Sequence, residues 1–176
     1  MDKFCEIMVE KERKGSTLLK IILIYAAGLI VAAILVFVGI SFLSPFLGII
    51  LMAVVAVLFG TWVLSTRLFI EFEYIVTNRD IDIDKIVARK NRKRIITITA
   101  STIIEGGKFH PDKFKNTANF QKVIHAEKNV ESAYYFVCKH QTFGKTLVVF
   151  SPNKKMIDAL KPFLSREIYY AFDSIQ

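Results

Sequence analysis

Five of the six residues from Arg89 to Arg94 are basic, the densest run of charged side chains in the sequence. Ammonium and guanidinium groups bind phosphates, and each one near a cytoplasmic leaflet contributes about 1 kcal/mol of attraction to anionic lipid. We therefore predict a lipid- or anion-binding site formed by Arg89, Lys90, Arg92, Lys93 and Arg94. The alternative, which stays open, is that these charges only fix membrane topology on a solvated hairpin.

Two other readings of this region are less favoured. Aromatic residues do not alternate with the basic run, as they would where bases are stacked, so nucleic acid is not an expected partner. Three aspartates alternate with isoleucine between Asp80 and Asp84. Because no flexible glycine-containing loop is present, we expect these carboxylates to pair with Arg92 or Arg94 across a hairpin rather than to bind calcium.

Residues typical of metal sites and catalytic centres are present without a recognisable spacing. His110, His125 and His140 have no close partner at the sequence spacing typical of metal ligands. Neither Cys5 nor Cys138 belongs to a CxxC motif. Neither a phosphate-binding glycine loop nor a G-x-S-x-G nucleophile motif occurs. We therefore predict no catalytic residues, no metal site and no cofactor, and we expect that the protein is not an enzyme.

The basic run follows a long segment without charge, since residues 21–66 contain no Asp, Glu, Lys, Arg or His. A helix needs about 20 apolar residues to cross a hydrocarbon core of about 30 Å, so this segment is long enough for two crossings. Pro45 lacks an N–H and would break a continuous helix. We predict a transmembrane hairpin over residues 18–66, with helices at about Leu18–Phe42 and Phe46–Leu64. An ion or proton path is not expected without ionisable groups.

Lysine and arginine flank the hairpin on both sides, whereas the turn at Leu43–Pro45 carries none. Because an excess of Lys and Arg marks the cytoplasmic side, we expect a multi-pass protein of the plasma membrane with both termini cytoplasmic. Residues 1–17 would then form a cytoplasmic flank, and residues 67–176 a cytoplasmic domain whose cysteines need not pair.

Each predicted helix contains two small residues four positions apart. These are Gly28 and Ala32 in the first helix, and Ala56 and Gly60 in the second. Such spacing lets helix backbones approach closely in lipid, so we predict that all four residues serve helix packing. Chance occurrence in helices rich in alanine and glycine explains the spacing equally well.

After the second helix the hydrophobic pattern changes to strict alternation, which indicates half-buried strands. We expect strands over 68–77 and 81–87, joined at Asn78–Arg79 because Asn tolerates the positive φ of a tight hairpin. The basic run is expected as a loop, followed by a third strand over Ile95–Thr99. Residues 101–105 extend that strand or form a fourth.

The remainder of the domain is expected to contain a second hairpin and a closing helix. Strands over 134–139 and 145–150 form the hairpin, and residues 120–128 permit a short amphipathic helix before it. Asn153 is a suitable N-cap for a helix that begins at Lys154. A following proline would end or bend that helix.

This order of elements resembles a pleckstrin-homology-like (PH-like) barrel. The stretch Tyr74–Arg79 looks like the Tyr-x-Val/Leu-Thr-Asn/Asp-Arg motif of bacterial PH-like domains, which often follow paired membrane helices. The whole chain is similar to a two-span membrane protein family of Gram-positive, clostridial-type bacteria. The matching segments are Glu73–Asn78, Asp82–Ile86, Arg92–Arg94, Thr146–Pro152 and Met156–Pro162.

The resemblance implies a membrane protein of the α+β class and implies no activity. In this architecture a helical transmembrane hairpin precedes a β-rich PH-like barrel closed by a C-terminal helix, although only five or six strands are counted where a full barrel has seven. We predict a membrane-anchored binding or scaffold protein that engages anionic lipid or a membrane protein partner. The alternative is an accessory subunit of a larger membrane complex that acts through its transmembrane helices.

Overall fold

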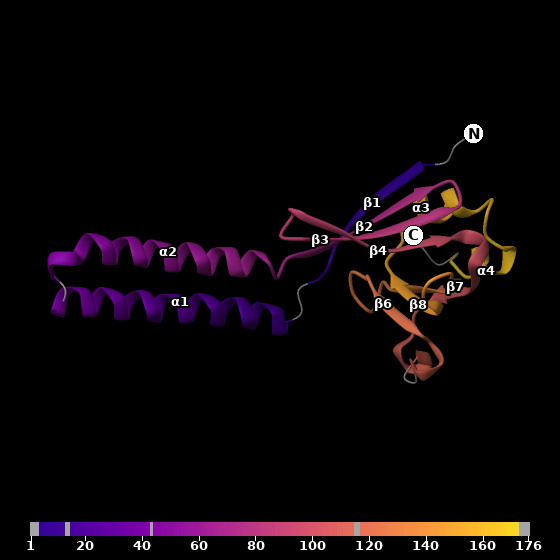
Figure 1. Cartoon of the computed structure of the whole chain (residues 1–176). Helices are drawn as coiled ribbons and strands as arrows, with labels where there is room; N and C mark the ends of the chain where they lie inside the picture. The colour runs from indigo at the N-terminus through magenta and orange to yellow at the C-terminus, as the bar shows by residue number, and fades with distance from the viewer. Residues whose placement is uncertain (1–3, 13–14, 43, 115–116, 173–176) are drawn as a thin grey trace. The chain divides into compact units, whose positions relative to one another are not determined.

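The computed structural model describes residues 4–12, 15–42, 44–114 and 117–172, and Figure 1 follows the chain from indigo at the N-terminus to yellow at the C-terminus. The chain separates into two compact units. A β unit combines Met1–Glu12 with Ile70–Gln176, and a helical unit consists of Arg13–Phe69. The helical unit is therefore inserted, in sequence, between two parts of the β unit.

Two apolar helices make up the helical unit. They are α1 (Gly15–Phe42) and α2 (Leu47–Thr66), with a 3-10 turn over Ser44–Phe46 between them. Both are long and apolar enough to cross a membrane, and few of their residues are buried inside the structure, unlike those of a core helix in a soluble protein. The expected pair of apolar helices around Pro45 is confirmed, while Leu43 of the expected turn lies outside the described residues.

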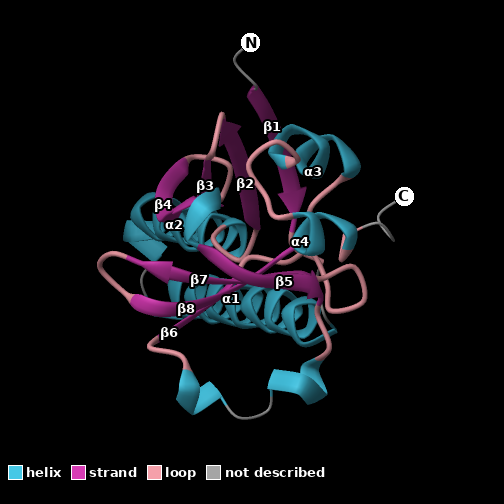
Figure 2. Ribbon diagram, turned by 90° about the vertical axis from the view of Figure 1, so that its right-hand side faces the viewer, coloured by secondary structure: helices cyan, strands magenta, loops and turns pink. Residues whose placement is uncertain are grey.

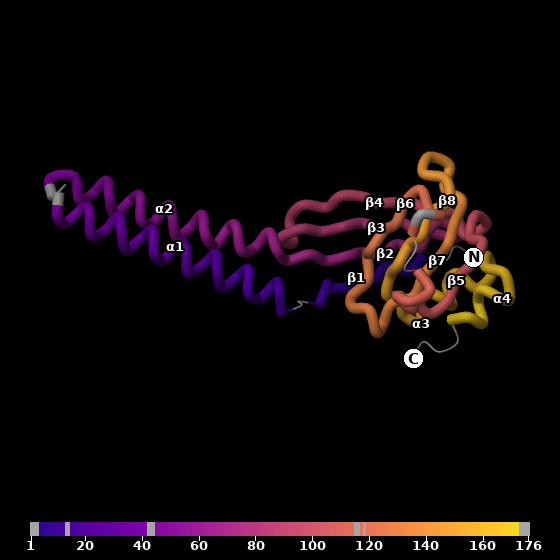
Figure 3. Tube along the Cα trace, turned by 90° about the horizontal axis from the view of Figure 1, so that it is seen from below, coloured from indigo at the N-terminus to yellow at the C-terminus, as the bar shows by residue number. Residues whose placement is uncertain are grey.

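Four antiparallel strands form the first sheet of the β unit, in the spatial order β1–β2–β3–β4 (Figure 3). They are β1 (Phe4–Glu10), β2 (Ile70–Thr77), β3 (Asp80–Val87) and β4 (Asn91–Thr99). The turn between β2 and β3 holds Asn78 at a φ of 55°. This confirms the expected hairpin, because Asn enters the left-handed region more readily than most residues.

Strand β1 lies in a segment that was expected to be a flank outside the domain. It pairs with β2 along its whole length, from Phe4 opposite Thr77 to Glu10 opposite Glu71. Its half-buried side chains pack against the hydrophobic core. The structure thus assigns residues 4–10 to the β unit, and the hairpin of helices interrupts that unit between its first two strands.

Strand β4 begins four residues before the expected third strand. The turn therefore contains only Ala88–Lys90, and the rest of the basic run lies within β4. Ala88 and Arg89 have φ values of 54° and 56°, the positive values that a type I′ turn requires at its two central positions. The expected loop is thus mostly a strand, in which side chains alternate between the two faces of the sheet.

The second sheet has the spatial order β5–β7–β8–β6. Its strands are β5 (Ile103–Lys108), β6 (Lys122–His125), β7 (Tyr134–His140) and β8 (Gly144–Phe150). The β7–β8 hairpin confirms the expected one. The helix expected over 120–128 is wrong, because β6 instead pairs in parallel with β8 and buries Ile124. So short an apolar segment does not distinguish a strand from a helix by its periodicity.

Two short helices follow the second sheet, α3 (Lys154–Leu160) and α4 (Arg166–Tyr170) (Figure 2). The Oδ1 atom of Asn153 accepts a hydrogen bond of 2.9 Å from the backbone N–H of Met156. This confirms the predicted N-cap. The side chains that α3 buries are Met156, Ile157 and Leu160.

One hydrophobic core joins the inner faces of both sheets with the C-terminal helices. Tyr74 crosses it, since its hydroxyl donates to the carbonyl of Ala126 at 2.6 Å and accepts from the backbone N–H of Ser151 at 3.2 Å. Among the described residues no strand ladder joins the two sheets, so the closed barrel expected from the sequence is not formed. The sheets stay open where lysine side chains line the space between them.

Candidate functional site

The predicted basic site does not form one patch, because its residues lie on two faces of the first sheet. Arg94 lies opposite Asp84 and Arg92 opposite Ile86, on the face turned away from the core. Lys93 lies on the inner face, where it lines a cavity between the sheets. Arg89 and Lys90 lie in the turn before β4.

The face of the first sheet that is turned away from the core, the outer face, carries a ladder of acidic side chains. Three arginines, Arg89, Arg92 and Arg94, meet these carboxylates. The acidic residues, contributed by β1, β2 and β3, are Glu6, Glu10, Glu71, Glu73, Asp80, Asp82 and Asp84.

The two arginines within β4 form ion pairs with carboxylates on β2 and β3. Arg94 places Nη1 2.8 Å from Asp82 and Nε 2.9 Å from Asp84. Arg92 pairs with Glu73 and lies 3.8 Å from Asp84. The pairing expected across the hairpin is therefore confirmed, and most of the charge of these two arginines is compensated within the protein.

Arg89 joins the turn to the first two strands. Its Nη2 atom lies 2.7 Å from Glu10 and its Nε atom 2.9 Å from Glu71. The hydrogen bonds that Arg89 donates to these two carboxylates raise its pKa above the ordinary value. This arginine remains exposed to solvent, but it already has two acidic partners.

Glu73 is the most enclosed carboxylate of the outer face, with no solvent-exposed surface. Burial raises the pKa of Glu73, a hydrogen bond with Glu6 raises it further, and the charge of Arg92 opposes both effects. Because a buried carboxylate without a counter-charge is costly, Arg92 has a structural role at this position.

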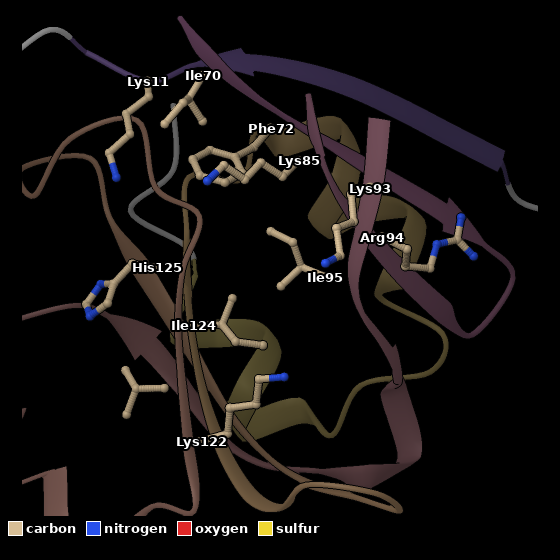
Figure 4. Close-up of a pocket in the computed structure, with 11 residues that line it drawn as sticks. Lys11, Ile70, Phe72, Lys85, Lys93, Arg94, Ile95, Lys122, Ile124 and His125 are labelled. Carbon is tan, nitrogen blue, oxygen red and sulfur yellow. The ribbon is translucent and has the colours of Figure 1, made fainter. Parts of the chain in front are cut away.

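A second basic surface lies on the inner side, where a cavity of about 490 Å³ opens between the two sheets (Figure 4). Its basic lining consists of Lys11 after β1, Lys85 on β3, Lys93 and Arg94 on β4, and Lys122 and His125 on β6. We call Lys85, Lys93 and Lys122 the cleft lysines. The apolar side chains beneath them form the cleft floor, which we define as Ile70, Phe72, Ile95 and Ile124.

The cleft lysines differ from the arginines of the outer face in having no acidic partner within the described part of the chain. Lys85 lies directly opposite Lys93 in the strand register. Among the residues that the structure describes, no carboxylate forms an ion pair with either of them or with Lys122. The ammonium of Lys122 instead lies over the ring of Phe143, 3.3 Å from its centroid.

An acidic group borders the cleft at the His125 end. The Oε2 atom of Glu127 lies 3.4 Å from Nδ1 of His125. Burial acts to raise the pKa of Glu127, but the hydrogen bond with His125 and the charges of His125 and Lys11 outweigh it, so the pKa is lowered. Lys11 is thus partly compensated, in contrast to the cleft lysines.

Sequence reasoning missed four of the six basic residues that line this cleft. A signal for one of them was present in β3, where Lys85 continues the buried alternation of Ile81 and Ile83. A lysine at a core-facing position of a strand is unusual and indicates a local opening of the core. No comparable signal marks Lys11 or Lys122, because their neighbours are distant in sequence.

The four predicted helix-packing residues divide into two classes. Gly28 lies so close to Thr61 of α2 that a Cβ would not fit, and Ala32 is buried. Ala56 and Gly60 are exposed, and a Cβ on Gly60 would meet no atom. The first pair therefore packs inside the hairpin, whereas the second pair faces away from it.

Other chemistry has little support in the structure. In the part of the chain that the structure describes, no three His, Cys, Asp or Glu side chains come together in a way that could hold a metal ion. Cys138 is fully buried, and burial raises its pKa to about 11. Burial also raises the pKa of Cys5. Neither thiol has the lowered pKa of a reactive cysteine.

Comparison with known proteins assigns the chain to a family. No curated protein and no solved structure matches the chain. The profile of the family described as "Bacterial PH-like domain (DUF6106)" matches residues 1–170. That range begins before β1, includes both apolar helices and ends with α4. The chain therefore belongs to the bacterial PH-like domain family (DUF6106).

Proposed function

We propose that this chain is a membrane-anchored binding or scaffold protein that presents its PH-like β unit at the cytoplasmic leaflet of the plasma membrane. The two apolar helices cross the membrane as a hairpin with both termini in the cytoplasm, and the β unit engages anionic lipid or a membrane protein partner. Kinship with two-span proteins of Gram-positive, clostridial-type bacteria belongs to this proposal. It is supported by the segments Glu73–Asn78, Asp82–Ile86, Arg92–Arg94, Thr146–Pro152 and Met156–Pro162.

The observation that carries the proposal is the arrangement at one end of the first sheet. The chain leaves β1 after Glu10 and re-enters at Ile70, and the backbone N–H of Lys11 donates to the carbonyl of Ile70 at 3.1 Å. The β3–β4 turn returns to the same end, since Val87 lies opposite Ile70. Arg89 in this turn contacts both Glu10 and Glu71.

Chain length limits how far this end can lie from the apolar helices. Helix α2 ends at Thr66 and β2 begins at Ile70, and four residues span at most about 14 Å. Attraction between basic side chains and an anionic leaflet acts over a Debye length of about 8–10 Å. A turn at this end that carries Arg89 and Lys90 is therefore well placed to meet lipid head groups.

Lipid selectivity can be tested on the full chain. Protein purified in mild detergent from membranes with comparable amounts of phosphatidylglycerol and phosphatidylcholine should retain the anionic lipid in several-fold excess, as counted by mass spectrometry. The excess should fall as the salt concentration rises, because the attraction is screened. Equal retention of both lipids at low salt would contradict lipid engagement and favour a protein partner.

Topology can be tested with single cysteines in a Cys5→Ser background. Phe46→Cys lies on the exposed turn between the helices, and Lys154→Cys lies on the exposed side of α3. An impermeant thiol reagent should label the first on intact cells and the second only after lysis. Cys138 is buried and does not interfere. The opposite labelling pattern would overturn the cytoplasmic assignment.

A second candidate function is that of an accessory subunit acting through its helices. It is favoured by the outward position of Ala56 and Gly60, which the hairpin itself does not use. If this is correct, Gly60→Leu should release a co-purifying membrane protein. Gly48→Leu is a matched control, because Gly48 is equally exposed and without neighbours. Neither change should affect lipid retention if the β unit carries the function.

A further inference from the structure

We propose that the cavity between the two sheets is a binding site for an anionic phospholipid. The phosphate of the head group would meet the cleft lysines, and the adjoining apolar part of the lipid would cover the cleft floor. This inference deepens the proposed function and rests on it, because it names the site and the ligand class through which the β unit engages the membrane.

The lysine charges in the cleft favour the binding of an anion. Lys85 and Lys93 lie directly opposite each other on neighbouring strands, a placement that is unfavourable for like charges. Every arginine of the outer face has a carboxylate partner, whereas no described carboxylate pairs with these two lysines. An anion between them would offset their repulsion.

The third cleft lysine approaches from the other sheet. Figure 4 shows Lys93 and Lys122 extending toward the same space from opposite sides, while the guanidinium of Arg94 points away. Arg94 is held outside by Asp82 and Asp84. Lys85 lines the same cavity from β3, with its side chain extending beside Phe72. Because lysine is a flexible point charge, side chains that line one cavity from three strands can contact a phosphate bound there.

The cleft floor distinguishes a lipid from a free phosphate ion. The cavity of about 490 Å³ lies within the size range of small-molecule sites, which combine an apolar lining with a few polar groups. A phosphate ion would use the lysines and leave the floor in contact with water. A phospholipid would satisfy the charge and cover Ile70 and Ile95, which are only partly buried by the protein.

The cleft lies close in sequence to the apolar helices, and this keeps it near its proposed ligand. Lys11 and Ile70 line it, and each lies four residues from the nearest end of an apolar helix. In a membrane-anchored chain this short tether keeps the cleft near head groups at high effective concentration. A site of modest affinity is therefore sufficient.

Lysine acetylation of the full chain in nanodiscs, read by mass spectrometry, tests the proposal. Nanodiscs contain either phosphatidylcholine alone or phosphatidylcholine with phosphatidylglycerol. The labelling rate of a bound site falls by 1 + [L]/Kd, so anionic lipid at ten times Kd should protect the cleft lysines about tenfold. Lys154 and Lys155, which are exposed on α3, should label equally in both.

The outcomes separate this inference from the proposed function. Protection of Lys90 without protection of the cleft lysines would retain lipid engagement at the turn and overturn the cleft site. No protection in either place would contradict both proposals. A further arm adds inorganic phosphate to neutral nanodiscs, and equal protection there would show that the site takes a soluble phosphate and not a lipid.

Variants give an independent readout. Lys85→Gln with Lys93→Gln should weaken phosphatidylglycerol binding by about 30-fold, as expected for the loss of two ammonium groups near a phosphate. Lys154→Gln with Lys155→Gln changes net charge equally and should leave binding unchanged. Circular dichroism checks that both variants are folded. An equal loss in both would show that only net charge matters and would overturn the cleft site.

Discussion

The outer face of the first sheet and the cleft beneath it both contain basic residues of one short run. The two regions differ in whether these residues have acidic partners. On the outer face, Arg92 and Arg94 are fixed between carboxylates. In the cleft, Lys93 lies opposite another lysine with no acidic partner among the described residues. Charge that is compensated inside a protein stabilises its fold, and charge that is left uncompensated is available to a ligand.

The two residue types suit these roles. The planar guanidinium of arginine donates several hydrogen bonds in a fixed geometry, which matches a ladder of carboxylates. The ammonium of lysine is a compact charge on a flexible stem and adapts to a ligand that arrives later. A count of basic residues in the run thus overstates the charge it offers to a membrane, because three of its five residues already have acidic partners.

The largest expected effect concerns β1, which supplies one edge of the outer face. A chain that begins at Ile70 loses β1, whereas a chain that joins residues 4–12 to 70–176 through a short Gly/Ser linker keeps it. The linker is feasible because Lys11 already contacts Ile70. Burial of Ile7 and Val9 against the core is worth a few kcal/mol, so we expect the shorter chain to unfold at clearly lower urea concentration by circular dichroism. Equal midpoints would contradict the assignment of β1.

The next largest effect is a difference in the free energy of unfolding between substitutions at two neighbouring residues of the basic run. Arg92→Gln leaves Glu73 without its counter-charge and should lower the free energy of unfolding by about 2 kcal/mol, a value reduced because Arg92 is half exposed. Lys93→Gln should change it by less than about 0.5 kcal/mol. Thermal unfolding of the full chain in micelles measures both, and adding Glu73→Gln to Arg92→Gln should recover part of the loss. Equal effects at the two positions would remove the distinction between the faces.

A smaller effect is the pH dependence caused by Glu73. Its pKa is raised in the folded chain, chiefly by burial, so the folded state binds this proton more tightly than the unfolded state. The resulting stabilisation is present at low pH and is lost as the pH rises from the ordinary carboxyl value through the raised one. The stability of the wild type relative to Glu73→Gln should therefore fall over that interval. Parallel stability curves for the two chains would show that Glu73 is not perturbed.

The smallest effect is expected in the cleft itself. Lys85→Gln removes the repulsion with Lys93 and should raise the free energy of unfolding by a few tenths of a kcal/mol at low salt. The gain should disappear at high salt, where the repulsion is screened. Melting curves at two salt concentrations, with Lys154→Gln as a control, measure this difference. A loss of stability would mean that Lys85 has a partner in the folded state.

Much of the fold could be predicted because it depends on neighbours in the sequence. The absence of charge over residues 21–66 predicts two apolar helices, since composition and length alone decide whether a helix can cross a membrane. Asn78 predicts a turn through its own backbone preference, and Asn153 predicts a helix start through a hydrogen bond three residues away. None of these features requires knowledge of a distant partner.

The strand register determines which residues of the basic run lie on each face of the sheet, and this register forms only in the tertiary structure. Alternation from the buried Ile96 and Ile98 would place Arg92 and Arg94 on the inner face. A bulge at Ile95 shifts the pairing, so that Ile83 lies opposite Ile96 but Asp84 lies opposite Arg94. A shift of one residue moves every following side chain to the other face, which here brings the arginines to the aspartates.

The apolar helices, the hairpin turns and the presence of a basic run thus follow from local sequence. The tertiary structure decided that residues 4–10 belong to the β unit, and that Lys11, Lys85, Lys93 and Lys122 share one cleft. The reason is physical: helices and turns are stabilised by contacts within a few residues, whereas a strand acquires its partner, its register and its exposed face only from segments far away in the chain.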